Sequence, residues 1–232
     1  MKSIAFDSSS IISLSMNDLL WVLKSLKDKF NGDFLISDGV REEIVDYPLK
    51  TKRFKFEALM VVNLLNNDYL KIYSSDEVNK KTVFIESLVN NLYKAKNEYI
   101  KIMQKGEIAS LALAIVLDSL AYVVDERTTR LVIEDPERLE KILRNKLHTN
   151  VSINRNNLEL LKKEVKNLRI IRSTELAIYA YELGLFKDYI KPTKYLKDVK
   201  KDLIDGLLWG LKLRGCSISE EEIDEALRFT NK

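Results

Sequence analysis

Five short apolar runs, separated by stretches with helical spacing, constrain this chain more than any other feature. Runs of this length bounded by polar turn residues are typical of buried strands. They cover residues 3–7, 34–37, 70–73, 120–124 and 168–172. Strands that alternate with helices predict βαβ units, and hence an α/β fold with a parallel sheet covered on both faces.

Helical periodicity fills the intervals between these runs. The C-terminal helix has a clear start, because Ser219 and Glu222 form the S-x-x-E pattern of a capping box. The absence of internal repeats and of Gly/Pro-rich linkers predicts a single domain over 1–232, with an extra helix near 78–104 and a basic insertion near 133–167. The other expected helices cover 18–30, 39–46, 53–67, a segment from Gly106 onward, 174–184, and 194–213.

Composition excludes several classes of protein. Charged residues make up 31% of the chain, and no stretch approaches the length of an apolar spanning helix. The N-terminus reaches Asp7 too early for a signal peptide. Cys216 is the only cysteine and His148 the only histidine, so an intrachain disulfide, a His dyad and a Cys/His zinc site are all excluded. We therefore expect a cytoplasmic protein whose chemistry depends on carboxylates, hydroxyls, lysines or arginines.

The net charge of +3 is unevenly distributed. Residues 136–172 contain ten Lys or Arg and four Asp or Glu, which leaves +6 on this segment and −3 on the remainder. Within it, Lys162, Lys163 and Lys166 have a spacing that places them near one helical face. This face either follows the backbone of a polyanion or is an ordinary solvated surface.

Acidic residues occur where the predicted strands end. Asp7 follows the first strand, and Asp125 and Glu126 follow the fourth, so that all three lie at one edge of a parallel sheet. Glu43 lies in the helix after the second strand, and Glu107 begins the helix that leads into the fourth. Each acid also has a local explanation, such as capping a helix or opposing its dipole. Their joint occurrence at one edge favours a common site.

A group of carboxylates around one cleft is costly, since unit charges about 4 Å apart repel by roughly 1 kcal/mol in water and about 4 kcal/mol at an effective dielectric constant of 20. Such groups either take up protons or bind a cation. Mg²⁺ and Mn²⁺ prefer oxygen ligands, activate water and stabilise charge on a phosphate. The sequence therefore predicts a Mg²⁺ or Mn²⁺ site and metal-dependent phosphodiester hydrolysis.

At these same positions the sequence resembles the PIN domain family. The opening "IAFDSSSIISL" is similar to the first family motif, "GVREEI" to the second, "GEIASLALA" to the third and "VVDERTTR" to the fourth. The segments "STELAIYAYELGL" and "LRGCSISEEEIDEAL" resemble the closing helices. The similarity covers about residues 1–50, 104–131 and 168–230. It implies a Rossmann-like α/β/α sandwich with a central, mostly parallel five-stranded sheet.

The resemblance also implies a function, the cleavage of RNA by an endoribonuclease. The expected metal ligands and catalytic acids are Asp7, Glu43, Glu107 and Asp125, with Glu126 assisting. Ser9 is expected to orient Asp7, whereas Arg127 and Arg130 either contact phosphate or pair with acids. The expected partners are RNA, a second copy of the chain in a homodimer, and an antitoxin or assembly partner that the sequence does not identify. The alternative is a non-catalytic RNA-binding or scaffold subunit with a PIN-like fold.

Overall fold

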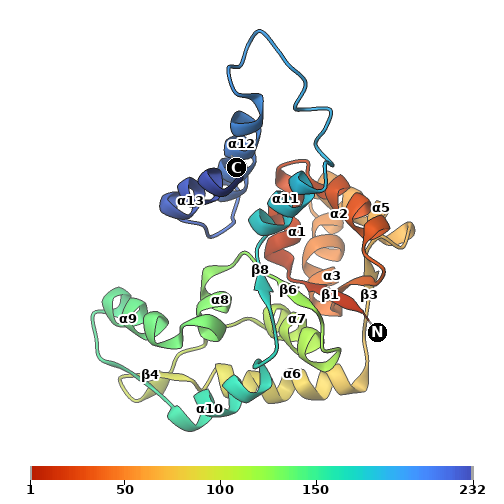
Figure 1. The fold of residues 1–232 in the computed structure, drawn as a ribbon. Coiled ribbons are helices and arrows are strands. Elements are labelled where there is room, and N and C mark those ends of the chain that lie inside the picture. The colour runs from red at the N-terminus through yellow and green to blue at the C-terminus, as the bar shows by residue number, and fades with distance from the viewer. Residues whose placement is uncertain (1, 231–232) are drawn as a thin grey trace.

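A five-stranded sheet forms the centre of the molecule (Figure 1). The structure is a computed structural model that describes residues 2–230, so that positions 1, 231 and 232 of the predicted domain lie outside the described residues. All pairings of the sheet are parallel, in the order β3-β2-β1-β6-β8. This confirms the predicted α/β class and the Rossmann-like sandwich. The strands are β1 (Ser3–Phe6), β2 (Asp33–Ile36), β3 (Lys71–Ile72), β6 (Ala121–Val123) and β8 (Ile170–Ile171).

Successive strand residues supply the two hydrophobic cores, because side chains alternate between the faces of a sheet. In β1, Phe6 packs in one core and Ala5 in the other. In β6, Val123 and Tyr122 divide in the same way. Both faces are covered by helices, which explains why the strands have continuous apolar sequences rather than alternating ones.

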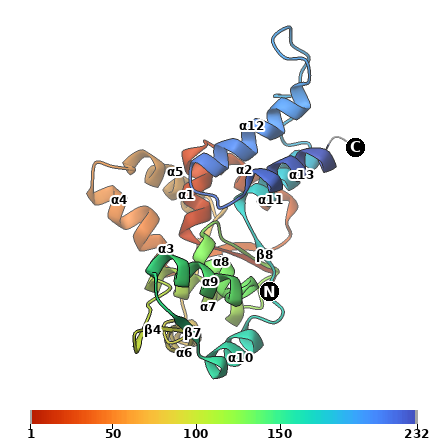
Figure 2. The ribbon, with the colours of Figure 1, turned by 90° about the vertical axis from the view of Figure 1, so that its left-hand side faces the viewer.

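The helices of the first face surround the core that contains Phe6 (Figure 2). They are α1 (Ser8–Met16), α2 (Leu20–Lys29), α5 (Lys55–Asn66) and α11 (Ser173–Glu182). The second core, around Tyr122, is enclosed by helices that follow β3 and β6. They are α6 (Asp76–Val89), α7 (Lys105–Val116), α8 (Arg127–Glu134), α9 (Pro136–Leu147) and α10 (Arg155–Glu164).

The helix predicted over 39–46 is present but changes its winding. It begins as α3 (Asp38–Arg41), continues as the π-helical turn η1 (Glu42–Asp46) and ends as α4 (Tyr47–Lys50). Ser37 caps its start by accepting a hydrogen bond from the Val40 amide. Single π turns inside helices frequently occur at functional sites, and this one carries Glu43.

The long helix predicted over 78–104 is wrong, since α6 ends at Val89. Residues 93–99 instead form an antiparallel hairpin of β4 (Tyr93–Ala95) and β5 (Glu98–Tyr99). Its two turn residues, Lys96 and Asn97, both have positive φ, a geometry that ends a helix. Asn90 caps α6, and its side-chain oxygen also accepts from the amides of Ile102 and Met103.

The predicted insertion at 133–167 joins this hairpin. Its strand β7 (Val151–Ile153) pairs with β4, which completes a second, three-stranded sheet, and α10 packs against α6. The two additions to the central fold therefore form one unit that shares the second core. The sequence analysis predicted neither strand: β4 falls in the segment expected to be a long helix, and β7 in the basic insertion.

The C-terminal part continues the first face. After α11, residues 183–198 project as an arm, and α12 (Val199–Leu213) and α13 (Glu220–Thr230) follow (Figures 1 and 2). The predicted capping box is confirmed, because Ser219 and Glu222 exchange two hydrogen bonds. Within residues 2–230, every helix is too short or too polar to span a bilayer.

Candidate carboxylate site

The candidate site lies where the order of the sheet reverses. From β1 the chain moves outward to β2 and β3, and it then returns to the other side of β1 with β6 and β8. Ligands of open α/β sheets bind outside the carboxyl ends of strands at such a switch point. Asp7 directly follows β1 and Asp125 follows β6 one residue later, so the sequence correctly placed two acids at this edge.

Asp7 is almost completely buried and has three hydrogen-bond donors around its carboxylate. Oδ2 accepts from the amide of Ser9 at 3.0 Å and from its hydroxyl at 2.6 Å, and Oδ1 accepts from the Ser110 hydroxyl at 3.1 Å. Burial raises the pKa of Asp7, although these donors lower it. The expected contact between Ser9 and Asp7 is present, and Asp7 also caps α1.

The other two serines of "DSSS" also connect the site. The hydroxyl of Ser8 bonds the carboxyl group of Glu43. Ser10 donates to the carbonyl of Asp7 at 2.8 Å and lies 3.1 Å from that of Val123, which joins the ends of β1 and β6. Each serine thus fixes one part of this edge.

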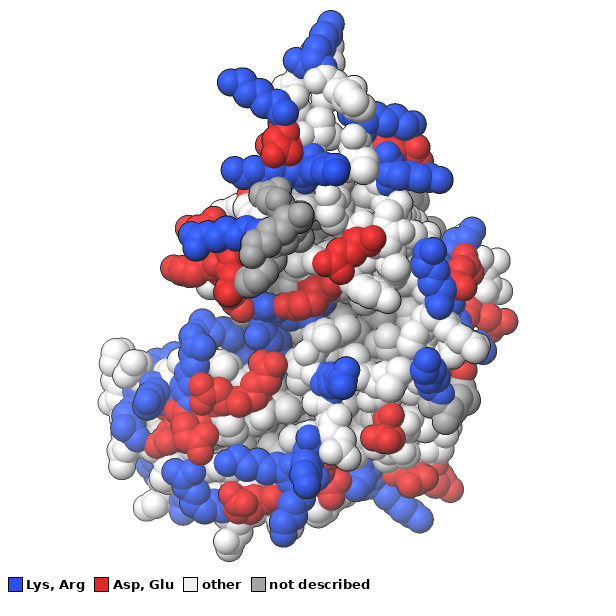
Figure 3. Space-filling view, in the orientation of Figure 1, with Lys and Arg blue, Asp and Glu red and all other residues white. Residues whose placement is uncertain are grey.

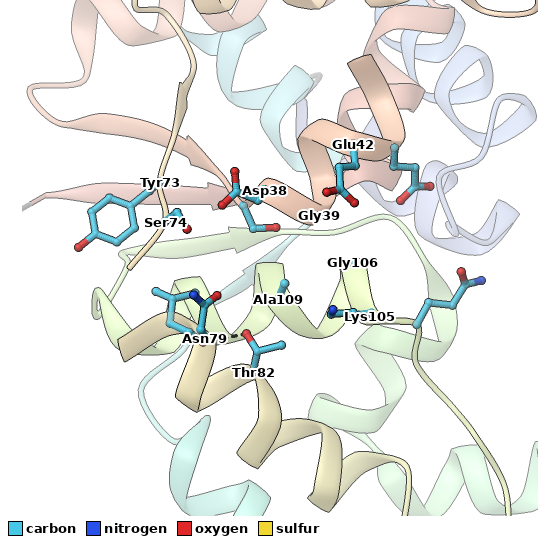
Figure 4. Close-up of a pocket in the computed structure, with 14 residues that line it drawn as sticks. Asp38, Gly39, Glu42, Tyr73, Ser74, Asn79, Thr82, Lys105, Gly106 and Ala109 are labelled. Carbon is cyan, nitrogen blue, oxygen red and sulfur yellow. Dashed lines mark hydrogen bonds between the residues drawn. The ribbon is translucent and has the colours of Figure 1, made fainter. Parts of the chain in front are cut away.

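Glu43 reaches the site because two glycines allow helices to approach closely. A Cβ at Gly39 on α3 would lie 3.1 Å from the Cα of Gly106 on α7, closer than most real contacts. Figure 4 shows the two glycines facing each other. A Cβ on Gly106 would lie 3.6 Å from Oε2 of Glu43. Partial loss of hydration raises the pKa of Glu43, with a smaller contribution from the charge of Asp7.

Glu107 lies at the same edge as Asp7. The reason is topological: α7 leads into the amino end of β6, so it must begin at the carboxyl edge. Its carboxylate accepts from the Gln104 amide at 2.7 Å in a capping box. Burial raises the pKa of Glu107 to about 7, with further contributions from the charges of Asp7, Glu126 and Glu43.

The two acids after β6 point in different directions. Oδ1 of Asp125 accepts from the Ser173 amide at 2.7 Å and Oδ2 from its hydroxyl at 2.6 Å, so both oxygens are used at the start of α11. The charge of Glu126 instead raises the pKa of Glu107, and its carboxylate caps α8 by accepting a hydrogen bond from the Thr129 amide at 2.5 Å. The acids brought together are therefore Asp7, Glu43, Glu107 and Glu126, which we call the acid cluster.

Sequence reasoning missed two residues behind the cluster. The hydroxyl of Tyr122 lies 2.8 Å from that of Ser110, which in turn contacts Asp7. Burial raises the pKa of Tyr122 well above its ordinary value, so this phenol stays neutral and can donate to Ser110. The available signal was Ser110 itself, a polar residue on the buried side of the apolar helix "GEIASLALA".

The predicted basic residues occupy two different places. Arg127 follows Glu126 and is exposed, whereas Arg130 donates to the Ser217 carbonyl at 2.8 Å and lies 3.4 Å from a carboxylate oxygen of Glu134. The predicted lysines are exposed but lie at the end of α10 and in the loop before β8, toward the amino end of that strand and away from the acid cluster. They are Lys162, Lys163 and Lys166.

The acid cluster has no positive partner in the described chain. None of its four carboxylates forms an ion pair with a Lys or Arg of residues 2–230. Within that same range, no three Asp, Glu, Cys or His side chains are grouped tightly enough to hold a metal ion as they stand. Three of the carboxylates, those of Asp7, Glu107 and Glu126, serve as helix caps, and binding a cation requires that the side chains of Glu107 and Glu126 turn.

A cavity of about 560 Å³ opens beside the cluster (Figure 4). It lies between α3, the start of α7 and the first turns of α6, with Glu43 and Lys105 among its lining residues. Its volume is within the range of pockets that accept small organic groups. Glu43, the member of the acid cluster that lines this cavity, is therefore accessible from a space that can admit part of a substrate.

No family model, no curated protein and no solved structure matches this chain.

Proposed function

We propose that this protein is a Mg²⁺- or Mn²⁺-dependent endoribonuclease of the PIN type. The observation that carries the proposal is the acid cluster: four carboxylates from four elements lie at the topological switch point, and none of them forms an ion pair with a Lys or Arg of residues 2–230. Burial raises the pKa of Glu107, and the neighbouring charges of Asp7, Glu126 and Glu43 raise it further. Divalent cations are the partners that best compensate such a set of oxygen ligands.

The residues present fit a metal of this class. Asp7, Glu43, Glu107 and Glu126 offer only oxygen donors, the ligands that Mg²⁺ and Mn²⁺ prefer. When bound, the metal supplies an activated water and stabilises the charge that develops on a phosphate. Ser9 and Ser110 hold the Asp7 carboxylate in one orientation, and Tyr122 holds Ser110.

Asp125, predicted as a ligand, has a positioning role in this proposal. Its carboxylate connects β6 to α11 through Ser173, and its backbone amide donates a hydrogen bond to the hydroxyl oxygen of Ser9 at 3.0 Å. Through Ser9 it therefore influences the orientation of Asp7.

We assign RNA as the substrate, with the exposed Arg127 beside the cluster as a phosphate contact. We also assign the cytoplasm as the compartment and a homodimer as the assembly.

A second candidate function is a non-catalytic RNA-binding subunit of the same fold. Two observations favour it: Glu107 and Glu126 serve as helix caps, and the described carboxylates do not already form a three-ligand group. The two functions differ in their dependence on metal. A scaffold binds RNA but does not cleave it in Mn²⁺.

The deciding experiment is incubation of the full-length protein with mixed single-stranded and structured RNA, with Mn²⁺ or with EDTA. We expect cleavage in Mn²⁺ only. Glu43→Gln should reduce the rate by about 100-fold, because it removes a ligand to the metal. Glu159→Gln is the matched control: Glu159 is an exposed glutamate on α10, outside the acid cluster and the cavity beside it, and its substitution should leave the rate unchanged. Equal cleavage in EDTA and Mn²⁺ would contradict the mechanism.

A further inference from the structure

A second polar pocket lies on the other side of the β6–α8 turn from the cavity beside the acid cluster. It measures about 420 Å³ and lies between α8, the start of α9 and the segment that enters α13. Three arginines line it: Arg127, Arg130 and Arg138. We call it the arginine pocket. Figure 3 shows basic side chains gathered over α8 and α9, directly below the acidic start of α13.

Two of these guanidinium groups have no partner in the described chain. Arg127 and Arg138 are exposed and form no side-chain hydrogen bond or ion pair with any of residues 2–230. Arg130 is held in place, since its guanidinium donates to the Ser217 carbonyl. The pocket therefore combines one fixed guanidinium group with two that are available to a ligand.

The one carboxylate that lines the pocket is already neutralised. Glu222 accepts from Arg172 at 2.8 Å and from the Ser219 amide at 2.8 Å. The pKa of Glu222 is lowered overall, because the effect of these two donors exceeds the opposing effect of partial burial. The first turn of α13 carries Glu220 and Glu221 as well, so the helix dipole does not make this an anion site. The guanidinium groups, and not the N-terminus of α13, attract an anion to this pocket.

The position of the pocket relates it to the acid cluster. Arg127 directly follows Glu126, and the amide of Ser217 donates to the carbonyl of Asp125 at 3.1 Å. The same turn thus carries one acid of the cluster on one side and the arginine pocket on the other. Planar guanidinium groups bind phosphate oxygens in a bidentate manner and remain charged at any physiological pH.

We propose that the arginine pocket binds a backbone phosphate of the RNA, next to the one that is cleaved at the acid cluster. This inference rests on the proposed function for its substrate, and it adds Arg138, from the basic insertion, as a specific contact. The acid cluster by itself repels a polyanion. A nearby pocket with a net positive charge supplies the attraction that brings the strand to this edge of the sheet.

The experiment measures binding without cleavage, so that it is independent of catalysis. A fluorescent single-stranded RNA of mixed sequence is titrated with full-length protein in EDTA, over a series of salt concentrations. Arg138→Gln should weaken binding about tenfold, because hydrogen bonds to charged groups contribute that much or more. The slope of log K against log salt should fall in magnitude by about 0.7, the value for one phosphate contact on a single strand.

Arg155→Gln is the matched control. Arg155 lies in the same basic segment and is exposed, and it is paired with Glu137 outside the pocket. The control should bind RNA as the wild type does. Equal RNA binding by wild type and Arg138→Gln, or an equal loss of binding in both variants, would contradict the proposal that the arginine pocket binds an RNA phosphate. Thermal melts of both variants verify that they fold.

Two further outcomes separate the possible explanations. An effect of Arg138→Gln on binding, together with no cleavage in Mn²⁺, supports the pocket and contradicts the nuclease. A parallel titration with inorganic phosphate tests the source of the anion. If phosphate binds in an Arg138-dependent way while RNA binding does not depend on Arg138, the pocket holds a free anion and the RNA assignment is wrong.

Discussion

Asp7 and Asp125 lie at the ends of two neighbouring strands, one residue out of register, and differ in their surroundings. Each follows a central parallel strand, each is buried, and the two strands pair in register from Ile4 to Phe6. Asp125 faces hydroxyl and amide donors of Ser173, whereas Asp7 faces serine donors and, beyond them, other carboxylates. The position of an acid at a strand end therefore does not determine its role, because the residues that meet it from elsewhere in the chain do.

The largest expected effect tests the structural side of this comparison. Asp125→Ala leaves the buried amide and hydroxyl of Ser173 without an acceptor, and it should lower the free energy of unfolding by about 3 kcal/mol. Asp125→Asn should cost less than half as much, because the amide oxygen still accepts from the Ser173 amide. Urea denaturation in EDTA and in Mn²⁺ measures both variants. A loss that grows in Mn²⁺ would show that Asp125 is a metal ligand after all.

The next effect tests the functional side. Without metal, Asp7→Asn removes a charge from the acid cluster and keeps the cap of α1, so the variant should melt at a higher temperature than wild type in EDTA. Mn²⁺ at a hundredfold excess over its dissociation constant should stabilise the wild type by about 2.7 kcal/mol. It should stabilise Asp7→Asn much less, and Asp125→Asn as much as wild type. Equal metal-induced shifts in all three proteins would mean that Asp7 is not a ligand.

The smallest effect concerns the pH dependence of the same cluster. The folded-state pKa of Glu107 is about 7, above its ordinary value of 4.5. Between these values the folded state holds a proton that the unfolded state has released, so stability falls as pH rises through this window. Glu107→Gln still accepts from the Gln104 amide but cannot titrate. In EDTA, wild type should therefore lose more unfolding free energy between pH 5 and pH 8 than Glu107→Gln, and parallel pH profiles would contradict this.

Much of the fold could be predicted because the signals are local. The five strands of the central sheet lie within two residues of the apolar runs, and α2, α5 and α11 of the first face follow from their periodicity, whereas α1 was not predicted. The hairpin at 93–99 was missed because its apolar residues also fit helical spacing, and only the turn at Lys96 and Asn97 distinguishes the two. Such a turn depends on backbone geometry that residue types indicate weakly.

The candidate site could be predicted in its position but not in its membership. The sequence placed Asp7, Glu43 and Glu107 at one edge, and the structure brings them together. It predicted Asp125 as a ligand with Glu126 assisting, and it did not indicate that the carboxylate of Asp125 accepts from Ser173, which lies 48 residues away along the chain. The roles of Ser110 and Tyr122 were missed for the same reason, since they depend on how α7 packs on β1 and β6.

The central position of β1 has a consequence for the synthesis of the protein. The strands β1, β2 and β3 come from the first third of the chain and can pair before the remainder exists, but β1 obtains its second neighbour only when β6 is made. Glu107 and Glu126 arrive with that second half of the sheet. If the acid cluster cleaves RNA, the nascent chain therefore does not cleave its own mRNA until more than half of its residues have been translated.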